Sequence, residues 1–169
     1  METKKLSASK FSLGYGLIIG ALLIILSLVL NMFGMKQAQN YNWISYVIIL
    51  AGIIWGSLVY RNSYSEGLIT YGQSFSVGFL IGLYAAILST IFSFIYLSYI
   101  NPGSINEILE ITRENLYDQE LSDDQIEQAM NFTEKMTTPI IMSGIVLIWN
   151  TICAVVFALI VSIFVKKEQ

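Results

Sequence analysis

Long apolar runs without any charged side chain alternate with short polar segments along this chain. A helix over the first run, residues 11–33, rises about 34 Å at 1.5 Å per residue, which is enough to cross a hydrocarbon core of roughly 30 Å. The pattern therefore predicts an all-α membrane protein whose single domain, residues 1–169, has four transmembrane helices. They are expected at residues 11–33, 43–60, 77–99 and 139–165.

The residues at the ends of these runs suit a membrane interface or a helix terminus. Tyr60 and Tyr99 close the second and third spans with aromatic rings, which favour the interface. Thr138 suits an N-cap and Pro139 the first turn of the fourth span. We interpret residues 62–76 as a polar linker at the membrane surface. A cleaved signal peptide is a poorer explanation of the first span, because its apolar core is too long and no small-x-small site follows.

The longest polar segment, residues 106–135, is strongly acidic. Its carboxylates face only two basic side chains, Arg113 and Lys135. A charge at the centre of a membrane helix costs roughly 2.5 to 3.5 kcal/mol, so this segment must lie in water. It predicts a soluble insert at about residues 101–138. The acidic residues are Glu107, Glu110, Glu114, Asp118, Glu120, Asp123, Asp124, Glu127 and Glu134.

Two apolar stripes at helical spacing predict two short helices within the insert. Ser122 to Gln125 fit a capping box at the start of the second helix. The insert is a docking hairpin, a cation site, or a solvated acidic face whose apolar stripe rests on the membrane domain. We favour the last interpretation, because Asp123 and Asp124 lack the glycine and the alternating ligands of a calcium loop. The stripes are Ile105, Ile108, Leu109, Thr112 and Leu116, then Ile126, Ala129, Met130 and Thr133.

Basic residues divide unevenly between the two sides of the membrane that four spans define. By the positive-inside rule, the side with more lysine and arginine is cytoplasmic, so both termini are expected there and the insert outside. The cytoplasmic set is Lys4, Lys5, Lys10, Arg61, Lys166 and Lys167, and the outer set is Lys36, Arg113 and Lys135.

Composition supports the membrane class and narrows the chemistry. Apolar residues make up 55 % of the chain and charged residues 12 %, against about 25 % charged residues in soluble domains. The net charge of -3 and the lack of a basic stripe argue against a nucleic-acid partner. The chain has no histidine and one cysteine, Cys153, so the usual metal ligand and acid–base group are missing. We expect no catalytic residue, metal or cofactor, and therefore no enzyme.

Small residues recur four apart on one face of each span. In lipid, such faces let helix backbones approach and gain dispersion contacts, so we interpret them as helix-packing seams. A pore lining or a homodimer interface is the alternative. The residues are Gly16, Gly20, Gly52, Gly56, Gly78, Gly82, Ala154 and Ala158, with Ser162 continuing the last row.

The first and third spans share a spacing that suggests a parallel duplication of a two-helix hairpin, a construction common in transporters. Among polar residues inside the spans, Asn150 stands out. It either contacts a substrate or, as we expect, forms an interhelical hydrogen bond worth about 1 kcal/mol. The matching positions are Ser12, Gly16, Ile19, Gly20, Ile25, Leu26 and Ser27 with Ser74, Gly78, Ile81, Gly82, Ile87, Leu88 and Ser89.

Several short motifs resemble a bacterial membrane family catalogued as domain of unknown function 4199. The resemblance covers nearly the whole chain and implies four inner-membrane helices with an acidic outer loop, but no activity. Relatives often carry a lysine where this chain has Gln73. The motifs are Tyr15-Gly16, Tyr71-Gly72-Gln73-Ser74-Phe75 with Gly78, Asn101-Pro102, and Asp123-Asp124-Gln125-Ile126-Glu127 ahead of Pro139.

Two functions remain open from the sequence. The first is a non-enzymatic protein that sits in the lipid bilayer and assembles with itself or with another membrane protein. The alternative is a small transporter or channel for an unidentified solute. A water-filled cavity that reaches Asn150 would favour the alternative.

Overall fold

Helices make up nearly all of the computed structural model, which describes residues 7–33, 40–119 and 121–167. Four of these helices are long and apolar enough to cross a membrane, as the sequence predicts. They are α1 (Ala8–Met32), α3 (Trp43–Tyr64), α4 (Tyr71–Ile95), which continues into the π-helical turn η1 (Tyr96–Ile100), and α7 (Pro139–Val165). Two shorter helices, α5 (Gly103–Tyr117) and α6 (Asp123–Met136), lie between η1 and α7.

The linker predicted at residues 62–76 is much shorter than expected. Helix α3 continues to Tyr64, and α4 begins at Tyr71. A capping box starts α4: the Gln73 backbone N–H donates to Thr70 Oγ1 at 3.3 Å, and the Thr70 N–H donates to Gln73 Oε1 at 3.2 Å. The predicted linker was too long because the prediction followed hydrophobicity alone. The Thr70–Gln73 cap satisfies free backbone N–H groups at the start of α4 and so allows its first turn to be polar.

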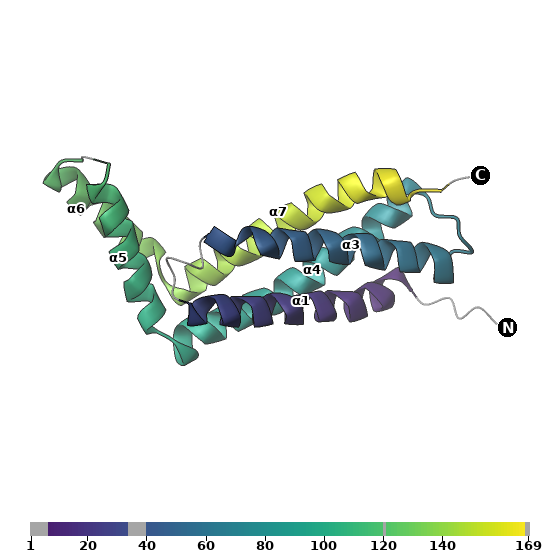
Figure 1. Ribbon diagram of the computed structural model, residues 1–169, viewed down its shortest axis with the longest axis horizontal. Coiled ribbons are helices and arrows are strands. Elements are labelled where there is room, and N and C mark those ends of the chain that lie inside the picture. The colour runs from purple at the N-terminus through teal and green to yellow at the C-terminus, as the bar shows by residue number, and fades with distance from the viewer. Residues whose placement is uncertain (1–6, 34–39, 120, 168–169) are drawn as a thin grey trace.

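Helix α4 is the centre of the bundle and contacts α1, α3 and α7. Figure 1 shows α1 and α4 running in one direction and α3 and α7 in the other. Both ends of the described chain lie at the same end of the bundle, which we call the terminal end. The α5–α6 pair lies at the opposite end, which we call the hairpin end.

The small residues of α4 and α7 lie where these two helices meet. A Cβ added at Gly82 would overlap the Cβ of Ala154, and one added at Gly78 would lie 3.3 Å from the Cβ of Ala158. Ala154 and Ala158 are completely buried. These four residues therefore allow the closest approach between α4 and α7.

The glycines of α1 and α3 occupy similar contacts within the chain. A Cβ at Gly16 would lie 2.5 Å from Tyr84 Cβ of α4, and one at Gly20 would meet Leu88. A Cβ at Gly52 would overlap Ile19 of α1, and one at Gly56 would overlap Ile81 of α4. All four glycines are buried between the chain's own helices, so neither lipid nor a second copy reaches these faces.

Apolar side chains cover the outside of the bundle, while several serines lie inside it. Ile91, Ile148 and Phe164 are more than half exposed, whereas Ser12 and Ser57 are completely buried. Because lipid tails are as apolar as these side chains, such a surface carries no cost in a membrane. The arrangement is compatible with a multi-pass membrane protein.

The two insert helices pack mainly against each other. Ile111 of α5 and Ile126 and Met130 of α6 are buried, and α5 also touches η1. Figure 1 shows the pair projecting from the hairpin end at an angle to the bundle. The expectation that the apolar stripe rests on the membrane domain is therefore corrected for α6, whose stripe residues Ile126 and Met130 are buried in the helix pair, whereas Ile111 of α5 lies outside the predicted stripe. At the start of α6, the Ser122 N–H donates to Gln125 Oε1 at 3.1 Å, as the predicted cap requires.

Candidate functional site

A cavity of about 320 Å³ lies between α1, α3, α4 and α7 at the hairpin end. None of the described residues that line it is charged. Its polar lining consists of Ser27, Asn31, Asn42, Ser45, Ser89, Ser93, Tyr96 and Asn150, and its apolar lining of Leu23, Ile24, Leu30, Phe92, Leu97, Ile108, Met142 and Val146.

Helices α1 and α4 each present two polar side chains one turn apart. Ser27 and Asn31 lie on one face of α1, and Ser89 and Ser93 lie on one face of α4, because residues four apart share a helix face. Ser27 and Ser89 are also matching positions in the suggested duplication. Equivalent faces of α1 and α4 therefore line one cavity, although the duplication itself stays a prediction.

The hydrogen-bonding groups of the cavity wall are only partly used by the protein. Asn31 Nδ2 donates to the Ser27 carbonyl at 2.7 Å. The Oγ of Ser89 is buried without a hydrogen-bond partner. Buried polar groups normally have partners, so such an atom requires an explanation. The Oγ atoms of Ser57, Ser74 and Ser104 are buried without a partner as well, and none of the four is accessible from the cavity, so the missing partner of Ser89 does not by itself indicate a ligand.

Asn150 lies on the α7 side of the cavity. Within the described residues its side chain forms no hydrogen bond, so the interhelical bond expected from the sequence is not found there. The neighbouring residue does bond to α3: Trp149 Nε1 donates to Tyr46 Oη at 2.9 Å. The Asn150 carboxamide keeps its two donors and its acceptor for a molecule in the cavity.

The hairpin end of the cavity is formed by irregular helix and by the insert. Tyr96 opens η1 and lines the cavity. The Asn101 N–H donates to the Tyr96 carbonyl at 2.8 Å, a separation of five residues that is typical of a π-turn. Ile108 of α5 also lines the cavity, so the base of the hairpin forms part of its wall.

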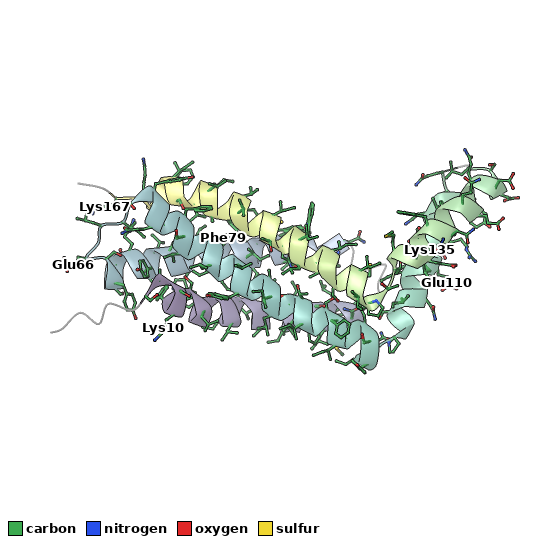
Figure 2. All side chains as sticks on the ribbon, turned by 180° about the vertical axis from the view of Figure 1, so that it is seen from behind. Lys10, Glu66, Phe79, Glu110, Lys135 and Lys167 are labelled. Atoms are coloured by element: carbon green, nitrogen blue, oxygen red, sulfur yellow. The ribbon has the colours of Figure 1, made fainter. Side chains whose placement is uncertain are left out.

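The terminal end of the bundle is closed by aromatic packing. The Phe11 ring lies 4.6 Å from the Tyr15 ring and 5.2 Å from the rings of both Tyr60 and Tyr64, measured between centroids. Figure 2 shows Lys10, Glu66 and Lys167 at this end and Glu110 and Lys135 on the hairpin. The cavity is therefore a pocket at the hairpin end whose floor is the tightly packed half of the bundle.

The last turn of the bundle at the terminal end is also held by hydrogen bonds. The backbones of Ile69 and Lys167 exchange two bonds of 3.0 Å, which pair the α3–α4 turn with the chain that follows α7. Arg61 Nη1 donates to the Val165 carbonyl at 3.1 Å, where the free carbonyls of α7 favour a cation. These contacts fix the closed end of the pocket.

The cavity can bind and orient a molecule, but the described lining residues do not include a carboxylate, lysine or histidine that could activate one of its serines. Across the described part of the chain, no group of three or more His, Cys, Asp or Glu side chains could hold a metal ion. Cys153 is half-buried on α7 and does not line the cavity.

The sequence pointed to some of these residues and missed others. Asn150 was singled out, and Ser27 and Ser89 appeared in the suggested duplication. Ser93 and Asn42 were not recognised. The available signal was a pair of small polar side chains four apart near the hairpin end of the first span, Ser27 and Asn31, and another in the third, Ser89 and Ser93.

The comparisons with known proteins concern the family of the chain. No curated protein and no solved structure matches it. A family model described as "Protein of unknown function (DUF4199)" matches residues 14–167, which run from within α1 to just beyond α7. Because this match includes all four candidate membrane helices, the insert and the cavity, the chain belongs to the DUF4199 family.

Proposed function

We propose that this protein is a non-enzymatic membrane transporter that takes up a small solute in the cavity at the hairpin end. The observation that carries the proposal is the cavity of about 320 Å³ lined by Asn150 in a bundle whose other half is tightly packed. A structure whose small-residue seams were its main feature would have favoured assembly alone. Here the small-residue seams pack the chain's own helices against each other. The carboxamide of Asn150, which forms no hydrogen bond within the described residues, belongs to the cavity wall.

The proposed location is the inner membrane of a bacterium, with both termini in the cytoplasm and the hairpin outside. Lys10, Arg61, Lys166 and Lys167 belong to the terminal end, and the positive-inside rule places that end in the cytoplasm. The remaining lysines used in this argument, Lys4, Lys5 and Lys36, lie outside the described residues. In this orientation the cavity faces the extracytoplasmic side.

Transport would require the closed half of the bundle to open. The seam of α4 against α7 includes Gly78, Gly82, Ala154 and Ala158, whose small side chains interlock less than leucine would. Helices α1 and α4 run parallel, so the suggested duplication would relate two halves that rock about the cavity. The cavity is then the outward-facing state of an alternating-access cycle.

Solute flux in liposomes tests this proposal. Liposomes that hold the purified full chain should take up uncharged solutes such as glycerol or short amides faster than empty liposomes do. Asn150→Leu should reduce this flux, whereas Thr151→Val, a change at the neighbouring residue outside the cavity lining, should not. Uptake no faster than in empty liposomes across a panel of uncharged solutes would contradict transport.

A second candidate function is assembly with another membrane protein through the hairpin. Tyr117 and Phe132 are 58 % and 64 % exposed on an otherwise acidic pair of helices. Aromatic residues are enriched at protein interfaces, and the surrounding carboxylates favour a partner with a basic surface. A photocrosslinker at Phe132 should trap such a partner in native membranes, and the same group at Gln128 is the control. Recovery of uncrosslinked monomer alone would contradict assembly.

A further inference from the structure

We propose that the cavity binds a small uncharged molecule that carries a hydroxyl or carboxamide group on an apolar body, and that it rejects charged molecules. This inference takes the site of the proposed function and names its ligand class. It concerns binding, so it can hold even if transport fails. The cavity occurs where all four spanning helices and the hairpin meet.

The polar wall of the cavity sets the hydrogen-bonding part of the ligand. The Asn150 carboxamide can both donate and accept, and Asn31 retains its carboxamide oxygen after Nδ2 bonds to Ser27. A ligand group with both a donor and an acceptor satisfies such a wall. Hydroxyl and carboxamide groups have this property.

The rejection of charge follows from what the cavity lacks among its described lining residues. An ion that leaves water for an apolar site needs an opposite charge or a full set of hydrogen bonds. The described lining contains only neutral side chains. A carboxylate or an ammonium ligand would therefore lose hydration that the cavity cannot replace.

The apolar wall sets the rest of the ligand. Leu23, Leu97 and Val146 line the cavity from α1, η1 and α7. A volume of about 320 Å³ is at the small end of the range of roughly 300 to 1,000 Å³ for ligand pockets. The ligand is accordingly small, with a short hydrocarbon part against these side chains and its polar group towards Asn31 and Asn150.

Cysteine accessibility in the full chain tests the site directly. In a Cys153→Ala background, Ser89→Cys places a thiol at the cavity wall. Ser57→Cys is the matched control, because the Oγ atoms of Ser57 and Ser89 are both buried without a partner, but Ser57 lies in the closed half of the bundle. Ser122→Cys on the exposed start of α6 provides the reference rate for each reagent.

In lipid nanodiscs, the neutral reagent methyl methanethiosulfonate should modify Ser89→Cys much faster than Ser57→Cys. The rate for each charged reagent, anionic sulfonatoethyl or cationic trimethylammonium-ethyl methanethiosulfonate, is divided by its rate at Ser122→Cys. This relative rate should be at least about tenfold lower at Ser89→Cys, because the cavity cannot pair the charge of the reagent. Equal rates at Ser89→Cys and Ser57→Cys would show that no accessible cavity exists. Equal rates for neutral and charged reagents would overturn the exclusion of charge.

Protection by model ligands tests the ligand class. Hexanamide and 1-hexanol should slow the modification of Ser89→Cys by methyl methanethiosulfonate, whereas hexanoate should not. Asn150→Leu should abolish the protection by hexanamide. Labelling of Ser57→Cys and Ser122→Cys should stay unchanged in the presence of the ligands, and this control excludes a general effect of the ligands on the bilayer. Equal protection by hexane would mean that an apolar chain alone fills the cavity, as a lipid tail would, and would overturn the inference. Protection without solute flux would support the binding site and refute transport.

Discussion

At the scale of single residues, close helix contacts in this protein depend on the absence of side-chain atoms. Gly82 faces Ala154 so closely that even one added methyl group meets the Cβ and lies 3.2 Å from the Cα of that residue. In lipid, where burial of a leucine gives no net drive between helices, such contacts supply the dispersion energy of the seam. The backbone on both sides leaves little room for adjustment.

We therefore expect Gly82→Ala to lower the stability of the bundle by about 1 to 3 kcal/mol, the usual cost of overpacking. Gly144→Ala on α7 is the control, because no atom lies within 4 Å of the added Cβ. The melting temperatures of the two variants in detergent should differ clearly, with only Gly82→Ala below the unmodified protein. Equal melting temperatures would show that the α4–α7 seam can relax.

At the scale of helices and their connections, the insert is a unit whose stability depends on the contact between α5 and α6. Ile126 is 5 % exposed on α6, next to the fully solvated Glu127. Because α5 makes the main contact with α6, a loss of packing at this position should stay local. The four spanning helices pack through other residues.

Ile126→Ala should open the hairpin, since truncation of a buried isoleucine costs about 2 to 5 kcal/mol, a large share of what two short helices can gain. Limited proteolysis should then cut within residues 103–136 while the melting temperature of the membrane bundle stays the same. Glu127→Ala is the matched control and should resist cleavage. Cooperative loss of both the hairpin and the bundle would contradict the independence of the insert.

At the scale of the whole molecule, the two ends of the bundle differ in packing and in charge. Aromatic rings, a backbone pairing and the Arg61–Val165 hydrogen bond close the terminal end, while the cavity occupies the hairpin end. The basic residues favour the cytoplasm for the closed end. The orientation of the molecule therefore decides which side of the membrane the cavity faces.

Orientation can be measured with single cysteines in a Cys153→Ala background. A membrane-impermeant maleimide is applied to intact cells, whose outer membrane is permeabilised where one is present. The maleimide should label Ser122→Cys on the hairpin. It should label Ser65→Cys in the α3–α4 turn only after the inner membrane is broken. The reverse pattern, or a carboxyl-terminal reporter active only outside, would overturn the proposed topology.

The sequence by itself determined the four spanning helices and the two helices of the insert, because the length of an apolar run and the spacing of a stripe are local properties. It also determined which small residues could form seams. It misplaced the start of α4, where a Thr70–Gln73 cap outweighed the polarity of the first turn. It did not predict the π-turn at Tyr96, which has no distinct sequence pattern here.

Only the tertiary structure decided that polar residues of different helices share one cavity. Ser27, Ser89 and Asn150 are far apart in sequence, and each would suit an interhelical hydrogen bond as well as a pocket wall. Which of these occurs depends on whether the helices stay close along their whole length. Glycine and alanine permit close contact along the seams, whereas the hairpin end contains a cavity to which all four helices contribute. This outcome depends on all four helices together.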